Sequence, residues 1–215
     1  MAEGGASVVL IVDDDAAVRD SLESLLRSVG QASVSYASAR AFLDAERPDV
    51  PACLVLDVRL PEQSGLDLQR ALAASGNHIP VIVITGHGDV PMSVAAMKAG
   101  AIDFLTKPFR DQDLLDAIQR GIRLDRERRA EAARLVSLQQ RYATLSPRER
   151  EVMSMVAEGL ANKQIAAALD LKEITVKVHR AQVMRKLEAK SLPELARIAD
   201  RLKTAMPAQS EYPLV

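Results

Sequence analysis

The stretch Cys53-Leu54-Val55-Leu56-Asp57-Val58 predicts the fold of the front half of the chain. Four apolar residues in a row indicate a strand that is buried on both faces, which is typical of parallel sheets. The carboxylate of Asp57 follows at the carboxyl end of this strand. Ligands of open α/β sheets bind at that end, so Asp57 is the first candidate functional residue.

Three other apolar segments also run into polar residues at their carboxyl ends. Residues 7–12 are followed by Asp13-Asp14-Asp15, and residues 80–84 by Thr85-Gly86. Residues 101–105 are followed by Thr106-Lys107-Pro108. Parallel strands present their carboxyl ends at one edge of a sheet. We therefore expect an acidic cluster, a lone aspartate, a hydroxyl and an amine to converge at that edge.

Helical patterns alternate with these strands. Apolar residues spaced three and four apart mark helices within residues 15–29, 38–43, 66–74, 89–99 and 111–122, and residues 33–36 read as one more short strand. Five strands, each followed by a helix, predict a parallel sheet with helices on both faces, because parallel strands need crossover connections.

The chain has 215 residues and a formal net charge of −1, which is unevenly distributed. Residues 1–122 carry −7, residues 123–143 carry +3 and residues 144–215 carry +3, so two modules with different partners are indicated. The single cysteine excludes an internal disulfide and favours a reducing compartment. The longest aliphatic run, residues 8–12, is too short to span a membrane, and no signal peptide precedes it, so we expect a cytoplasmic protein.

The expected crowd of carboxylates has a chemical consequence. Carboxylates that gather at one point repel one another unless a proton or a cation neutralises them, and their hard oxygens favour Mg²⁺. One of them can then attack a phosphoryl group, while Lys107 and the Thr85 hydroxyl neutralise charge on its oxygens. The plainer interpretation is that these aspartates only begin loops or cap helices. It suffices for any single aspartate, but four matching strand ends together favour a site.

Residues 7–122 resemble the receiver domain of two-component response regulators. The likeness rests on Asp13-Asp14, Asp57, the loop from Pro61 to Gly65, Thr85 and Lys107-Pro108, in that order. The resemblance implies a doubly wound, flavodoxin-like sheet of five parallel strands in the order 2-1-3-4-5.

The same resemblance implies that Asp57 is the phosphoacceptor, assisted by Lys107 and Thr85. Asp14, Asp57 and the backbone carbonyl of Arg59 would hold Mg²⁺, with Asp13 contributing directly or through water. Lys107 would pair with the phosphoryl oxygens, and its bond to Pro108 would be cis.

The resemblance also implies a switch, in which Thr85 moves toward the phosphoryl group and Phe104 turns inward with it. The family often has tyrosine at this place, and Phe104 lacks its hydroxyl; a simple core ring is an equal alternative. Arg59 and His87 lie two residues beyond Asp57 and Thr85, and would influence the lifetime of the phosphoryl group.

Residues 123–143 predict a helical linker, because they are rich in charge and helix formers. Leu135, Leu138, Tyr142 and Leu145 step by three and four, but the same register meets Glu131, so the coiled-coil signal is weak. A solvated spacer that continues the fifth helix is the favoured interpretation.

Residues 144–206 predict four short helices, and 207–215 a tail. Ser146-Pro147-Arg148-Glu149 and Ser191-Leu192-Pro193-Glu194 are capping signatures, and Asn162 is the predicted cap of the second helix. Val176, Val183 and Leu187 mark the buried side of the third helix. A helix, a tight turn and a helix fit the DNA major groove.

The third helix also has a cationic free face. Residues 172–190 hold six basic and two acidic residues. The side chains opposite its buried stripe are Ile174, Lys177, Val178, Ala181 and Arg185. Cations contact phosphates and guanine, and small apolar groups meet thymine methyls. Charge alone would leave a solvated surface as the better interpretation.

Residues 144–203 resemble the LuxR-type helix-turn-helix domain, through LSPREREV at 145–152, GLANKQIA at 159–166 and TVKVHR at 175–180. With the receiver, the chain resembles FixJ-type response regulators. The DNA contacts we expect are those of Thr175, Lys177, Val178, Arg180, Ala181 and Arg185. The family often has serine just before the recognition helix, where this chain has Lys172-Glu173, so a different cap is expected.

The combined prediction is an α/β receiver (residues 1–122) joined by a helical linker (123–143) to an all-α DNA-binding domain (144–206). It would be a transcription factor, not an enzyme beyond its own phosphotransfer and dephosphorylation. A histidine kinase would phosphorylate it, and it would dimerise through the face between Asp89 and Leu115 to bind double-stranded DNA, with RNA polymerase as a further partner.

Two alternatives stay open at this point. One is a magnesium-dependent phosphohydrolase with Asp13 as nucleophile, since residues 9–15 also read as a strand followed by D-x-D. The other is a DNA-binding regulator whose receiver is never phosphorylated.

Overall fold

The computed structural model describes residues 6–205. The chain divides into two compact units, the first ending at residue 130 and the second beginning at residue 131. The helix α5 (Asp111–Ala143) is continuous over 33 residues, so the predicted linker does continue the fifth helix. The boundary between the units falls inside this helix.

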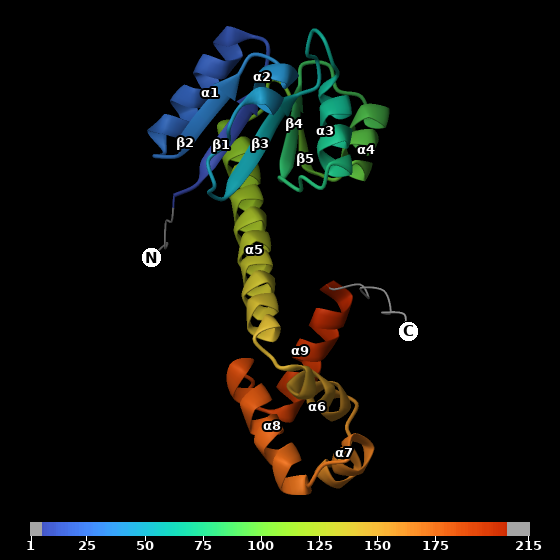
Figure 1. The fold of residues 1–215 in the computed structure, drawn as a ribbon. Coiled ribbons are helices and arrows are strands. Elements are labelled where there is room, and N and C mark those ends of the chain that lie inside the picture. Colours follow the sequence, from blue (N-terminus) through green and yellow to red (C-terminus); the bar gives the residue numbers. More distant parts are fainter. Residues whose placement is uncertain (1–5, 206–215) are drawn as a thin grey trace. The chain divides into compact units, whose positions relative to one another are not determined.

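The first unit is built on one five-stranded parallel sheet (Figure 1). The strands are β1 (Val8–Val12), β2 (Ala32–Tyr36), β3 (Ala52–Asp57), β4 (Val81–Thr85) and β5 (Ala101–Thr106). Their spatial order is β2-β1-β3-β4-β5, which confirms the predicted order. The connecting helices are α1 (Ala16–Ser28), α2 (Ala39–Asp44), α3 (Gly65–Ala74), α4 (Val90–Lys98) and the first part of α5.

Each face of the sheet has its own apolar core. Successive strand residues point to opposite faces, so Leu10 packs with Phe42 and Leu68 of α2 and α3, whereas Ile11 packs with Leu26 of α1 and Leu114 of α5. Every residue of β1, β3 and β4 is buried. The central strands are therefore covered on both sides, which explains their unbroken apolar sequence.

Cys53 belongs to this core, as its place in a strand predicts. Its thiol is fully buried, and this burial, with a smaller effect from Asp125, raises its pKa above the ordinary value. A Cβ at Gly121 would lie only 2.5 Å from the Cys53 sulfur, so α5 approaches β3 closely because residue 121 has no side chain.

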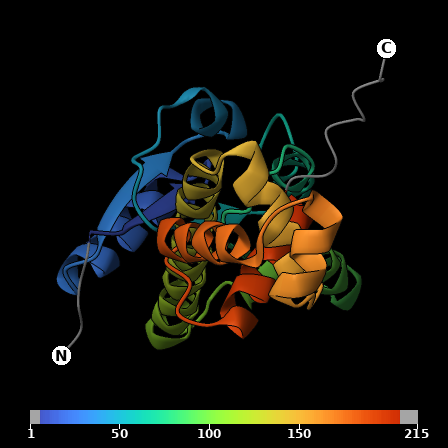
Figure 2. The same cartoon turned by 60° about the horizontal axis from the view of Figure 1, so that its bottom comes forward.

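In the second unit, the described residues form α6 to α9 and the last turns of α5, coloured from yellow to red in Figure 2. These helices are α6 (Pro147–Ala157), α7 (Asn162–Leu169), α8 (Glu173–Lys186) and α9 (Leu192–Ala205). Val152, Ile165 and Val183 are among the fully buried residues of its core, and Leu138 and Tyr142 of α5 pack against that core. This packing explains why the end of α5 belongs to the second unit.

Two of the three cap predictions are confirmed and one is wrong. Ser146 and Glu149 form the expected capping box at the start of α6. The N-cap of α7 is Ala161, whereas Asn162 is the first helical residue and its Oδ1 accepts a hydrogen bond of 2.8 Å from Arg180. Asn162 thus serves a contact between helices that the local sequence does not reveal. At α9, Ser191 Oγ accepts from the Glu194 N–H, as predicted.

The N-cap of α8 is Lys172, and no side chain caps this helix. This agrees with the different cap that Lys172-Glu173 led us to expect. None of the helices within residues 6–205 combines the length and the hydropathy that crossing a membrane requires.

Candidate functional site

The carboxyl edge of the sheet brings together three charged side chains from three different strands. Lys107 follows β5, and its Nζ lies 2.7 Å from Asp13 Oδ2, after β1, and 3.0 Å from Asp57 Oδ1, at the end of β3. The two aspartates are 1% and 5% exposed. The predicted convergence of strand ends is therefore present, with the ammonium bridging two buried carboxylates.

Burial and pairing act in opposite directions on the ionisation of this cluster. Burial raises the pKa of Asp57, and although its hydrogen bond with Lys107 counteracts this effect, the pKa stays above the ordinary value. For Lys107, burial alone would lower the pKa, but the bonds to Asp13 and Asp57 outweigh it and the pKa is raised. Lys107 therefore keeps its positive charge between the two carboxylates.

The loop after β3 fixes the second oxygen of Asp57. The backbone N–H of Arg59 donates to Asp57 Oδ2 at 2.7 Å, while the Arg59 side chain is exposed. Gly65 closes the loop by donating from its N–H to the Val58 carbonyl at 2.9 Å. A Cβ at Gly65 would lie 2.1 Å from the Asp57 carbonyl oxygen, so only glycine allows the loop to return this closely.

Thr85 ends β4 and is fully buried. Its Oγ1 accepts a hydrogen bond of 3.3 Å from the His87 N–H, and its carbonyl accepts one of 2.7 Å from the Lys107 N–H. The half-buried ring of Phe104 lies beside the following loop, because a Cβ at Gly88 would come within 2.9 Å of it. The predicted switch residues Thr85 and Phe104 thus border the same loop.

The donor set suits a hard cation with few protein ligands. Residues 6–205 contain no group of three or more His, Cys, Asp or Glu side chains placed to hold a metal ion. Asp13 and Asp57 are held close together by Lys107, whereas Asp14 is exposed. Mg²⁺ commonly uses one or two carboxylates and keeps several waters, so the two buried carboxylates of Asp13 and Asp57 fit it.

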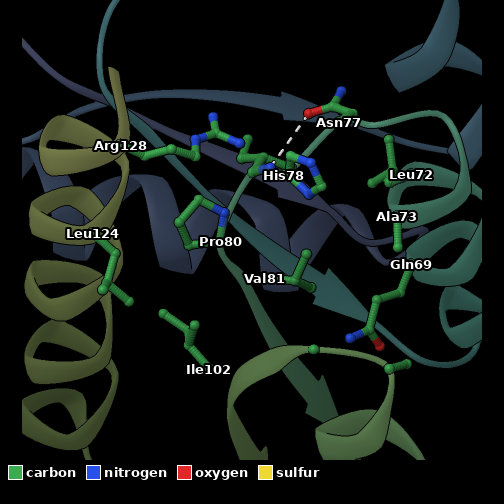
Figure 3. A pocket seen from close by; sticks show the side chains of 13 residues that line it. Gln69, Leu72, Ala73, Asn77, His78, Pro80, Val81, Ile102, Leu124 and Arg128 are labelled. Carbon is green, nitrogen blue, oxygen red and sulfur yellow. Dashed lines mark hydrogen bonds between the residues drawn. The ribbon is translucent and has the colours of Figure 1, made fainter. Parts of the chain in front are cut away.

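A cavity of about 360 Å³ lies elsewhere, at the opposite edge of the sheet, where β4 begins (Figure 3). Pro80 and Val81 line it, together with Gln69 of α3 and Leu124 of α5. The Gln69 amide nitrogen donates to the Ala96 carbonyl at 3.0 Å. Since Asp57 lies at the carboxyl edge, this cavity is separate from the charged cluster.

In the second unit, α8 presents the face that its sequence pattern predicts. Val176 and Val183 are buried, and the side chains on the opposite side are exposed: Ile174, Lys177, Val178, Ala181 and Arg185. Thr175 and Arg180 are half-buried at the border of this face. The expected free face is therefore present in the structure.

The cations of α8 are not equivalent. Lys186 Nζ lies 2.7 Å from Glu149 Oε2 and also donates to the Thr144 carbonyl, so it joins α8 to the start of α6. Arg180 donates to Asn162, as described above. Arg185 contacts only the neutral Gln182, and Lys177 has no partner, within the part of the chain that the structure describes. Lys177 and Arg185 thus keep uncompensated charge.

Sequence reasoning missed Glu149 and Asp125 as buried charged groups. Glu149 is 6% exposed and pairs with a lysine 37 positions away, and Asp125 is 1% exposed within a stretch that reads as a solvated spacer. The local signals, a capping signature for Glu149 and two arginines three and four positions after Asp125, indicate pairing but not burial. The Lys186 partner of Glu149 and the Ala52 partner of Asp125 become visible only in the tertiary structure.

Comparison with known proteins identifies both units. Residues 9–119 match the family of response regulator receiver domains, and residues 143–199 match the LuxR family of bacterial regulatory proteins. The chain belongs to the response regulators that carry a LuxR-type domain. Both matches are to families of regulators, so they favour a response regulator over the phosphohydrolase alternative with Asp13 as nucleophile.

Relatives of this response regulator align over nearly its whole length. It is 54% identical to nodulation protein W of Bradyrhizobium diazoefficiens over 91% of the chain and 86% of that protein. It is 48% identical to the response regulator protein TodT of Pseudomonas putida, over 94% and 88%, and 50% identical to the transcriptional regulatory protein FixJ of Rhizobium meliloti, over 89% and 94%.

Solved structures of response regulators also resemble this chain. The response regulator StyR superposes with a TM-score of 0.81 at 46% identity, over 92% of this chain and all of that one. Full-length FixJ from B. japonicum superposes with a TM-score of 0.55 at 44% identity, over 92% and 97%. Both combine a likeness in sequence with a likeness in fold.

Proposed function

We propose that this response regulator is a transcription factor whose DNA binding is controlled by phosphorylation of Asp57. The observation that carries the proposal is the setting of that carboxylate. Lys107 contacts one of its oxygens at 3.0 Å and the Arg59 N–H contacts the other at 2.7 Å, at the ligand-binding edge of the sheet.

The phosphate donor is a phosphohistidine of a histidine kinase. A carboxylate oxygen of Asp57 attacks phosphorus, the bond between phosphorus and the histidine nitrogen breaks, and an aspartyl phosphate forms. The Lys107 ammonium and the Arg59 N–H lie where the phosphoryl oxygens gather charge, and both stabilise it there. Lys107 then exchanges its bond to Asp57 for one to the phosphoryl group.

Mg²⁺ is the cofactor of this step. Asp13, Asp14, Asp57 and the backbone carbonyl of Arg59 would hold it, and Asp14 is exposed and free to approach. The ion supplies charge neutralisation between the carboxylates and the phosphoryl oxygens.

The switch begins at Thr85. Its hydroxyl, now bonded to the His87 N–H, turns to a phosphoryl oxygen, and the loop that borders Phe104 moves with it. The exposed side chains of Arg59 and His87 flank the phosphoryl group and set how readily water reaches it.

The second copy of the chain docks on the face between Asp89 and Leu115. Val90, Val94 and Met97 share one side of α4 and are 76%, 45% and 49% exposed. Adjacent apolar side chains in water indicate an interaction surface. Pairing two receivers brings two α8 helices to neighbouring half-sites of an operator.

In the DNA complex, Lys177 and Arg185 supply the uncompensated positive charge. Thr175, Val178 and Ala181 lie on or beside the same face of α8, and Arg180 borders it. Contact with RNA polymerase, when both are bound to a promoter, completes the proposed set of partners.

A gel shift with a regulated promoter fragment tests this function. Treatment with acetyl phosphate and Mg²⁺ should raise the affinity of the wild type and of a Lys98→Ala control, and should leave Asp57→Asn unchanged. Mass spectrometry of the treated protein should find the added phosphate on Asp57. A wild type that takes up no phosphate yet binds the fragment would support a phosphorylation-independent regulator instead.

A further inference from the structure

The recognition helix α8 carries apolar side chains on both sides. Val176 and Val183 fill the core, yet Ile174 and Val178 on the other side are 64% and 53% exposed. Single exposed apolar residues are ordinary on protein surfaces. These two are four positions apart and therefore neighbours on one helical face, so they form a continuous apolar strip.

Two cations share the face of the strip, while the exposed carboxylate of Glu173 adjoins Ile174. Lys177 adjoins it within the first half of α8 and Arg185 lies two turns further along the same face. Lys177 and Arg185 have no ion-pair partner among the described residues, so this face favours a polyanion, which agrees with the family assignment of this unit.

The chemistry of DNA then restricts what the strip can contact. In the major groove, the C5-methyl of thymine is the one apolar group that a base edge presents. Both side chains are branched at Cβ and have few rotamers, so little conformational entropy is lost on contact. Their separation along the helix is about 6 Å, which corresponds to about two base-pair steps of roughly 3.4 Å.

From this juxtaposition we propose that Ile174 and Val178 read two thymine methyls, no more than about two base pairs apart, in each half-site. The proposal rests on the proposed DNA-binding function and adds the identity of the bases. Ile174 and Val178 are specificity-determining residues, while Lys177 supplies attraction that does not depend on the base. Ile174 lies outside the TVKVHR motif at 175–180, so that motif does not identify it as a DNA contact.

Deoxyuridine tests the proposal directly, because it is thymidine without the C5-methyl. Full-length protein, treated with acetyl phosphate and Mg²⁺, first selects its preferred duplexes from a random pool. Each thymine of the selected half-site is then replaced singly by deoxyuridine, and the dissociation constant is measured by fluorescence anisotropy at fixed salt.

Loss of one buried methyl should weaken wild-type binding about fourfold at two thymine positions. Ile174→Ala should abolish the difference between thymine and deoxyuridine at one of them only, and Val178→Ala at the other. Leu192→Ala removes a 42% exposed apolar side chain from α9 and should retain both differences. Lys177→Ala should weaken thymine and deoxyuridine duplexes equally.

Because Ile174 and Val178 are exposed, their alanine variants should melt like the wild type, and circular dichroism checks this. Full retention of both methyl effects in Ile174→Ala and Val178→Ala overturns the inference and leaves DNA binding intact. Failure of the wild type to enrich any duplex overturns the proposed function itself, and the inference with it.

Discussion

The carboxylate of Asp125, in α5, accepts a hydrogen bond of 2.9 Å from the backbone N–H of Ala52, the first residue of β3. Asp125 is 1% exposed and also pairs with Arg128 at 2.5 Å and Arg129 at 2.8 Å. The strand that ends in Asp57 is therefore tied at its other end to the helix that leaves the receiver. Arg128 and Arg129 neutralise the buried carboxylate of Asp125, which accepts this hydrogen bond.

Asp125→Ala should destabilise the receiver by about 1–3 kcal/mol, because the buried Ala52 N–H loses its partner. Asp125→Asn keeps an acceptor oxygen and should cost less. Asp116→Ala, an exposed position on the same helix, should change stability by less than about 0.5 kcal/mol. Urea denaturation followed by circular dichroism, fitted with one transition per unit, measures the difference. Equal stability of Asp125→Ala and Asp116→Ala would contradict the role of the tie.

Gly65→Ala should destabilise the receiver by about 1–3 kcal/mol and slow phosphorylation of Asp57. Its Cβ would stand 2.1 Å from the Asp57 carbonyl oxygen, a backbone atom that cannot move without shifting the proposed phosphoacceptor. Gly86→Ala is the matched control, since a Cβ there meets nothing within 4 Å. Thermal melting and the rate of labelling by acetyl phosphate report the two effects. A Gly65→Ala protein that is labelled as fast as Gly86→Ala would refute this explanation.

Glu149 should make the free energy of unfolding of the second unit depend on pH. Its hydrogen bond with Lys186 is the main cause that lowers the pKa of this carboxyl below its ordinary 4.5. A lowered pKa means that the ionised group stabilises the fold at and above the ordinary pKa, and that this contribution is lost as the pH falls through the lowered value.

Melting of the wild type between about pH 6 and pH 3 should therefore show a loss of stability that Glu149→Gln lacks. At pH 7, Glu149→Gln should be less stable by about 1–3 kcal/mol, because Lys186 and the Ser146 N–H lose a charged partner. Glu151→Gln, whose ion pair with Arg148 is exposed, should lose less than about 1 kcal/mol. Parallel pH curves for wild type and Glu149→Gln would count against this account.

Two lysines of α8 should behave differently in DNA binding. Lys177 has no partner among the described residues, so Lys177→Ala should reduce the slope of log affinity against log salt by about 1. Lys186 is held by Glu149 and the Thr144 carbonyl, so Lys186→Ala should leave that slope unchanged and lower the melting temperature of the unit. Salt titrations of binding, paired with melting curves, separate the two. A reduced slope for Lys186→Ala would place its charge at the phosphates instead.

The sequence by itself was sufficient for the sheet and for the convergence of Asp13, Asp57, Thr85 and Lys107 at one edge. The reason is that buried parallel strands have unbroken apolar sequences and all point the same way, so their last residues must meet. The exposed face of α8 followed in the same manner from helical periodicity, which is a local property. The capping box of Ser146 and Glu149 is local as well.

Only the tertiary structure showed which distant groups pair with Asp125, Glu149 and Asn162. Asp125 bonds Ala52 across 73 positions, Glu149 binds Lys186 across 37, and Asn162 bonds Arg180 across 18 instead of capping its own helix. Side chains such as these gain from distant groups that no local pattern encodes, and desolvation makes the pairing obligatory once they are buried. Local periodicity fixes which residues are buried together, whereas packing selects the partner of each buried polar atom.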